Sequence, residues 1–232
     1  MVPFRMTVRW NRRFASCFAL LVPFAAVLAV GCSQPDRESA GTPSGPVAAT
    51  APARAPGAAR PRILAFGDSL TAGTGAAPNE AYPAALGHRL GLEILNLGIP
   101  GSTTADGLDR LAEALQLQPR VVLICLGGND SLQRQPVAQT FANLATIVDQ
   151  FQQGGTFVVL VGVRSASVLD QHRRPSARLA REKRVLLVPD ILDGVLGNAR
   201  LMADTLHPNE AGYDHIAARL AKVLEPYLDL LR

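Results

Sequence analysis

The stretch VVLICLGGND at residues 121–130 joins a short apolar run to glycines and polar residues. Its first six residues show no apolar and polar alternation, which is typical of a strand buried on both faces. Similar runs occur at 62–66, 92–97, 156–161 and 185–188, and amphipathic stretches occur at about 79–90, 104–117, 136–152, 175–183 and 208–230. Buried strands that alternate with helices predict an α/β fold, in which helices cover a parallel five-stranded sheet on both faces.

Candidate site residues follow three of these strands, at the edge where parallel sheets bind ligands. Ser69 follows the first strand, where a helix N-terminus would favour an alkoxide, although Asp68 or Ser69 could equally be a helix cap. Gly98 follows the second strand and could present its N–H to a ligand, or be a plain turn glycine. Asn129 could direct its amide at developing negative charge, or form an Asx turn.

A fourth candidate feature lies near the C-terminus, where His207 precedes Pro208 and follows Asp204 by three residues. A residue before proline is disfavoured in helical conformation, so His207 is predicted on a loop, with Pro208 in the first turn of the last helix. Asp204 could accept a hydrogen bond from one imidazole nitrogen and leave the other to act as a base. The alternative is a surface or capping histidine.

The N-terminus is predicted to be a targeting segment rather than part of the fold. Arginines lie at positions 5, 9, 12 and 13, an apolar run covers 14–30, and the segment AVGC at 29–32 resembles the bacterial lipobox. We therefore expect a lipoprotein-type signal peptide at 1–31, lipidation of Cys32, and attachment to a membrane, with Ser33 favouring the periplasmic side of the outer membrane. An ordinary secretory signal or a retained membrane anchor are the alternatives.

Beyond the leader, residues 32–61 are rich in proline and alanine and are predicted to be a tether, whereas 62–232 has the length of one domain. The net charge of +4 comes from the leader, since 23 − 4 = 19 basic residues then face 19 acidic ones. This balance gives no support to nucleic acid binding. Cys17, Cys32 and Cys125 leave no pair for a disulfide, and Cys125 is interpreted as packing rather than as a nucleophile.

Together, GDSL at 67–70, Gly98 after Asn96, GGND at 127–130, and Asp204 with His207 resemble the SGNH/GDSL hydrolase family. The region from Asn96 to GGND is most similar to the branch of thioesterase I, lysophospholipase L1 and bacterial arylesterases. This resemblance implies a three-layer α/β/α sandwich with a flavodoxin-like sheet. It also implies a monomeric enzyme that hydrolyses small-molecule ester or lipid substrates without a metal or organic cofactor.

The resemblance also implies a role for each candidate. Ser69 would attack the acyl carbonyl, His207 would transfer the proton, and Asp204 would orient the imidazole. The oxyanion hole would consist of the Ser69 N–H, the Gly98 N–H and the Asn129 amide.

Substrate choice depends on the loops at 131–136 and 163–169. The second loop lacks features that thioesterase-like relatives often have, so we expect short acyl esters, with Arg164, Arg173 and Arg174 as candidate contacts to an anionic head group. The alternatives are a carbohydrate O-acetylesterase and an envelope lipoprotein that binds a ligand without catalysis.

Overall fold

The structure, a computed structural model, describes residues 63–164 and 171–231. The predicted signal peptide, Cys32 and the tether lie outside these ranges, so the predictions made for them stay predictions. Within the described ranges, no helix has the length and apolar character needed to cross a membrane. All the strands, helices and apolar clusters given below lie within 63–231.

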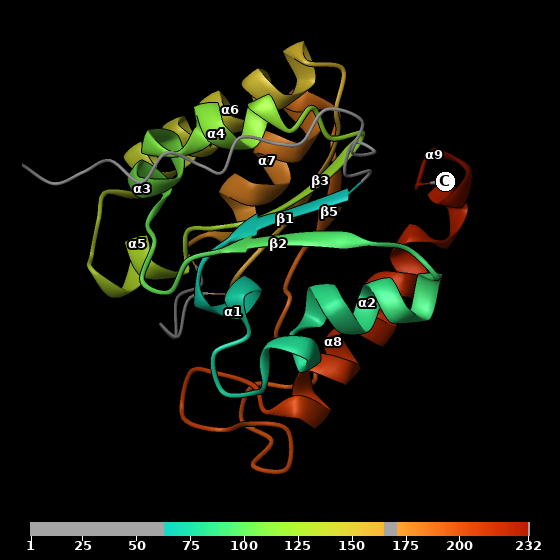
Figure 1. The fold of residues 1–232 in the computed structure, drawn as a ribbon. Coiled ribbons are helices and arrows are strands. Elements are labelled where there is room, and N and C mark those ends of the chain that lie inside the picture. The colour runs from blue at the N-terminus through green and yellow to red at the C-terminus, as the bar shows by residue number, and fades with distance from the viewer. Residues whose placement is uncertain (1–62, 165–170, 232) are drawn as a thin grey trace, which may run out of the picture. The chain divides into compact units, whose positions relative to one another are not determined.

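A five-stranded parallel sheet forms the centre of the fold (Figure 1). The strand order is β2-β1-β3-β4-β5, which is the flavodoxin-like order. The strands are β1 (Ile63–Gly67), β2 (Ile94–Gly98), β3 (Val121–Cys125), β4 (Phe157–Val161) and β5 (Leu186–Val188). The predicted α/β/α sandwich with a flavodoxin-like sheet is confirmed, and each strand overlaps the apolar run that predicted it.

Helices cover both faces of this sheet and form two separate apolar clusters (Figure 1). One face carries α1 (Ser69–Ala72), α2 (Tyr82–Leu90) and α8 (Glu210–Leu224), and the other carries α3 (Thr104–Asp109), α4 (Leu111–Gln116), α6 (Val137–Gln153) and α7 (Arg173–Lys183). Successive residues of β1 enter opposite clusters and are fully buried. Burial on both faces explains why the strands lack polar alternation.

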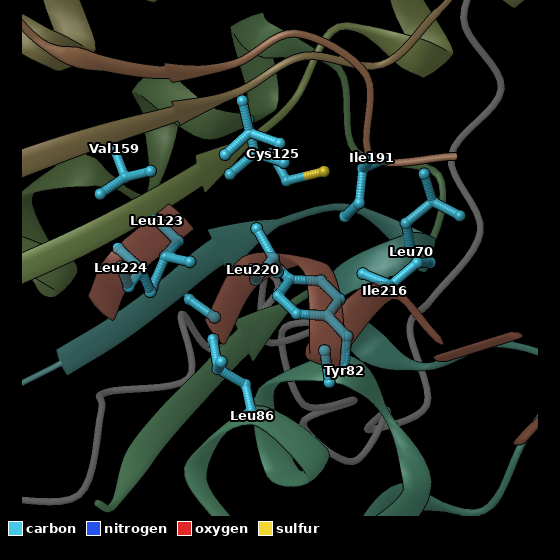
Figure 2. Close-up of a cluster of buried hydrophobic side chains, with 14 of the residues drawn as sticks. Leu70, Tyr82, Leu86, Leu123, Cys125, Val159, Ile191, Ile216, Leu220 and Leu224 are labelled. Carbon is cyan, nitrogen blue, oxygen red and sulfur yellow. The ribbon is translucent and has the colours of Figure 1, made fainter. Parts of the chain in front are cut away.

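The cluster on the α2 and α8 face contains Cys125, which is drawn in Figure 2 among leucine, isoleucine and tyrosine side chains. Cys125 is completely buried, and burial raises the pKa of its thiol well above the ordinary value. The thiol therefore stays protonated and packs as an apolar group.

Several helix boundaries differ from those predicted. The stretch at 104–117 divides into α3 and α4 at Arg110, and the stretch at 208–230 divides into α8, a 3-10 turn (Glu225–Tyr227) and α9 (Leu228–Leu231). The region at 79–90 likewise begins with a separate 3-10 turn (Pro78–Glu80), and α5 (Gly128–Leu132) was not predicted. Pro208 does not lie in the first turn of α8, because Asn209 caps that helix and Pro208 forms a β-bridge with Met202.

Two paired glycines, Gly67 and Gly98, end β1 and β2 and allow α1 to pack directly across the strand ends. A Cβ atom on Gly67 would lie 2.0 Å from Thr71 Oγ1, and one on Gly98 would lie 2.1 Å from the backbone nitrogen of Ala72. Side chains at these positions would push α1 away from the sheet. Because Ser69 is the first residue of α1, the two glycines set the position of its side chain.

We expect Gly98→Ala to lower the free energy of unfolding by about 3 kcal/mol or more, because a backbone atom cannot move out of the way of the new methyl group. Gly91→Ala is a suitable control, since Gly91 has a φ of 65° but no atom lies within 4 Å of the place that its new methyl group would occupy. That change should cost only about 1–2 kcal/mol, the penalty for left-handed backbone. Denaturant unfolding compares the two variants, and equal losses would contradict the close-packing argument.

Candidate active site

Ser69 begins α1 immediately after β1, at the carboxyl edge of the sheet. Asp68 caps the helix, and its Oδ1 accepts a hydrogen bond from the backbone N–H of Leu70 at 3.0 Å. The helix ends after one turn at Gly73, which has a φ of 91° in the left-handed region that favours glycine. Both expected roles thus occur side by side, with Asp68 as the cap and Ser69 exposed to the site.

His207 lies on the loop before α8, as predicted, and its side chain contacts Ser69. The bridge between Met202 and Pro208, and a hydrogen bond from Ala203 N–H to the His207 carbonyl at 2.9 Å, hold this loop. His207 Nε2 lies 3.0 Å from Ser69 Oγ, and its Nδ1 lies 2.8 Å from Asp204 Oδ2. An ionised carboxylate can only accept, so Nδ1 carries the proton and Nε2 is left to accept from the Ser69 hydroxyl.

Asp204 is held in its ionised form by hydrogen bonds rather than by burial. The hydrogen bond with His207 is the largest cause that lowers the pKa of Asp204 from 3.8 to about 2, and the backbone N–H groups of Leu206 and His207 add to it. Both N–H groups donate to Oδ1 at 2.7 Å. With 54% of its side chain exposed, Asp204 still keeps one orientation, because both of its oxygens have partners.

Asn129 lies in the first turn of α5 and lines the same cavity as Ser69. Its Nδ2 donates to the Ser102 carbonyl at 2.9 Å, which leaves the second amide hydrogen for another acceptor. The neighbouring Asp130 is buried and accepts from the backbone N–H and the hydroxyl of Thr104. These two hydrogen bonds join α5 to the start of α3 and fix the helix that carries Asn129.

Gly98 lies close to the site, but its N–H donates to Asn96 Oδ1 at 2.9 Å. It does not line the cavity beside Ser69, whereas Gly101 does. Gly101 lies in the turn closed by the hydrogen bond from Ser102 N–H to the Ile99 carbonyl, with a φ of 83°. Our sequence interpretation did not assign a role to Gly101, although Pro followed by Gly is typical of such a turn.

Arg110 joins the carboxyl ends of β1 and β2 through its side chain. Sequence reasoning did not identify this role. Its guanidinium donates to the carbonyl of Gly67 at 2.7 Å and to that of Leu97 at 2.8 Å. It also lies 4.1 Å from the centre of the Phe66 ring, a cation–π contact. The break between α3 and α4 at Arg110 therefore coincides with the residue that holds both strand ends.

A cavity of about 310 Å³ opens above Ser69, His207, Asn129 and Gly101. Most of its remaining wall is apolar and consists of Leu70, Pro100, Leu132, Val163, Leu192, Leu196 and Leu206. Arg164 also lines this cavity, and with Arg173 it borders a neighbouring pocket, whereas Arg174 lines neither. Of the two predicted specificity loops, 131–136 contributes Ser131 and Leu132, and most of 163–169 lies outside the described residues.

Residues 65–215 match the model of the GDSL-like lipase/acylhydrolase family. The chain belongs to this family. It is 32% identical to esterase TesA of Pseudomonas aeruginosa over 183 residues, which make up 74% of this chain and 91% of that protein. It is also 32% identical to thioesterase 1/protease 1/lysophospholipase L1 of Escherichia coli K12, over 74% of this chain and 87% of that protein.

A solved structure, esterase EstA from Pseudoalteromonas sp. inhibited by monoethylphosphonate, matches with a TM-score of 0.67 and 25% identity. The match covers 72% of this chain and 98% of EstA. EstA therefore consists almost wholly of the matched region. The predicted family is thereby confirmed, and the chain is a carboxylic ester hydrolase.

The site holds a second carboxyl group, Asp68, whose pKa is shifted in the opposite direction to that of Asp204. Burial raises the pKa of Asp68 from 3.8 to about 6, and the Leu70 N–H and the His207 imidazole offset only part of this shift. A carboxyl group with a raised folded pKa contributes stability below about pH 4 and loses that contribution as the pH rises through about 6.

We expect the stability of the wild type relative to Asp68→Asn to fall by about 2–3 kcal/mol between about pH 4 and about pH 7. The asparagine cannot ionise, and its carbonyl oxygen can still accept from Leu70. Denaturant unfolding at both pH values measures the difference. Asp204→Asn is the control and should show little change over this range, because the folded pKa of Asp204 lies below it. If the difference in unfolding free energy between the wild type and Asp68→Asn is the same at both pH values, the raised pKa of Asp68 is contradicted.

Proposed function

We propose that the chain hydrolyses acyl esters through nucleophilic attack by Ser69. The observation that carries this proposal is the hydrogen-bonded series from Ser69 to His207 to Asp204, with distances of 3.0 and 2.8 Å, at the base of an apolar cavity. His207 Nε2 takes the Ser69 proton as Oγ bonds to the acyl carbon, and then protonates the leaving alcohol or thiol. Water, deprotonated by His207, then attacks the acyl-enzyme. The acyl–Oγ bond breaks, the carboxylic acid leaves, and His207 returns the proton to Ser69 Oγ.

The negative charge on the tetrahedral oxygen needs donors on the cavity wall. We assign the backbone N–H of Ser69, at the start of α1, and the amide of Asn129. For the third donor we favour Gly101 over Gly98, because Gly101 lines the cavity and the Gly98 N–H already donates to Asn96. The Ser69 and Gly101 donors follow the ends of β1 and β2, which Arg110 joins.

The apolar wall supports esters of short, apolar acyl groups as the substrates, including aryl esters and thioesters. Leu192 and Leu196 come from the segment between β5 and α8, and Leu132 comes from α5. Apolar side chains outnumber the polar ones that line the cavity besides the reacting groups, so the wall offers few partners for the hydroxyl groups of a sugar. A carbohydrate O-acetylesterase remains an outcome that a comparison of substrates can reveal.

We further propose that Cys32 carries a lipid and that the enzyme is a monomer on the periplasmic side of the outer membrane. The basic residues, the apolar run and the AVGC segment at 29–32 support this location. A single acyl chain would bind only marginally, so stable attachment needs the multi-chain lipid that the lipobox resemblance implies.

We expect Ser69→Ala to lower the hydrolysis of p-nitrophenyl butyrate by about 10⁴-fold or more, because it removes the hydroxyl that is hydrogen-bonded to His207. A fluorophosphonate probe should label the wild type and fail to label Ser69→Ala. Ser131→Ala is the matched control, since Ser131 lines the same cavity but has no assigned role, and it should keep the label. Labelled Ser69→Ala would contradict the nucleophile assignment, and an unlabelled wild type would favour a non-catalytic binding lipoprotein.

We expect kcat/KM for p-nitrophenyl esters to rise from acetate to butyrate by about fourfold per methylene, because each buried methylene contributes about 0.8 kcal/mol. Leu196→Asn should flatten this rise, since it makes one wall of the cavity polar. A panel of chain lengths beside acetylated sugars provides the measurement. A preference for acetylated sugars over butyrate esters would reject the apolar acyl site and favour carbohydrate O-acetyl ester hydrolysis.

A further inference from the structure

The large apolar side chains that are most exposed among the described residues gather around one opening. They are Ile99 (49% exposed), Leu132 (55%), Leu196 (41%) and Leu206 (38%), and we call them the apolar rim. The three leucines line the cavity above Ser69, and Ile99 precedes Pro100, which lines it as well.

The rim comes from three separate parts of the chain. Ile99 follows β2, Leu132 ends α5, and Leu196 and Leu206 lie between β5 and α8. No single amphipathic helix accounts for their exposure, so their convergence is a property of the folded surface. Elsewhere, residues of this size and type are at least partly covered in the described ranges. Exposed large apolar side chains that gather at one place on a surface are typical of an interaction site.

The position of the rim restricts what can cover it. The opening leads to Ser69, so a folded protein or a second copy of the chain would close the route for substrate. A lipid layer, in contrast, buries apolar side chains and also contains acyl esters. Arg164 lines the same cavity and is exposed, so a cation is available to a phosphate of a lipid head group.

We propose that the apolar rim docks on a lipid surface, so that an acyl ester enters the cavity directly from the lipid layer. The inference rests on the proposed ester hydrolysis and adds to it a docking surface at the entrance of the cavity. Docking would bury the four rim side chains in the interfacial region of the lipid, as amphipathic surfaces of membrane-bound proteins do.

The length of the N-terminal segment is compatible with docking on the membrane that would hold Cys32. Thirty residues, 33–62, separate Cys32 from Ile63, where β1 begins. Fully extended, this segment spans at most about 100 Å. A domain of this size is about 40 Å across, so the segment is long enough for the carboxyl edge of the sheet to reach the same lipid surface.

The test measures vesicle binding separately from catalysis. The chain from residue 33 omits the predicted leader and Cys32 but keeps every described strand and helix, and Ser69→Ala prevents hydrolysis during the assay. This protein should float with phosphatidylcholine vesicles. Leu132→Gln and Ile99→Gln should each lower the partition coefficient about tenfold or more, because a buried leucine or isoleucine is replaced by a polar side chain. Leu132→Phe is the matched control and should bind at least as well as the parent.

A kinetic comparison in the active protein provides a second measurement. Ile99→Gln should leave the hydrolysis of a water-soluble butyrate ester unchanged, since Ile99 does not line the cavity, and should lower the hydrolysis of the same acyl group presented on vesicles about tenfold. Absence of vesicle binding by the parent, or equal binding by Leu132→Gln and Leu132→Phe, would overturn the proposal. Fluorophosphonate labelling of Ser69 in the same preparation shows whether ester hydrolysis itself still stands.

Discussion

The close contact between α1 and the ends of β1 and β2 is the constraint on which the rest of the site depends. Gly67 and Gly98 remove the side chains that would separate them, and Asn96 Nδ2 donates across the contact to the Thr71 carbonyl at 2.8 Å. Arg110 joins the two strand ends from the opposite side. Burying its guanidinium is costly, and its Nε has no hydrogen-bond partner. Two charge-assisted hydrogen bonds and the Phe66 ring offset part of that cost.

The strands could be predicted from the sequence because a strand buried on both faces consists of a run of apolar residues without polar alternation. The predicted helix boundaries were less accurate where a helix ends at a residue that contacts another element far away in the sequence. Nothing in the local pattern at 104–117 indicates a break, since Arg110 leaves helical geometry at a position where it reaches two carbonyls on another element. Similarly, α5 begins with Gly128 after a left-handed Gly127, a local sequence that favours a turn.

For the site, the topology rule was sufficient to select Ser69 and Asn129, because the ends of β1 and β3 are neighbours at the point where the strand order reverses. The sequence could not distinguish Gly98 from Gly101, since one ends β2, the other closely follows it, and both suit a turn. The two glycines are distinguished only by the structure: the Gly98 N–H donates to Asn96, whereas Gly101 lines the cavity. The place of Leu196 and Leu206 at the cavity could not be predicted either, because a leucine in a loop is informative only when its exposure is known.

Asp68 and Asp204 show how the same residue type serves two purposes within one site. Asp204 is exposed but keeps its charge and orientation through hydrogen bonds, so it can stabilise a protonated His207. Asp68 is buried beside Ser69, where its charge is disfavoured by burial and opposes the negative charge that develops on the substrate. Its Oδ1 caps α1 through Leu70, and the short helix would otherwise begin with an unpaired N–H. The energetic cost of burying Asp68 is therefore linked to the position of Ser69, and the proposed oxyanion donors would have to act against the charge of Asp68.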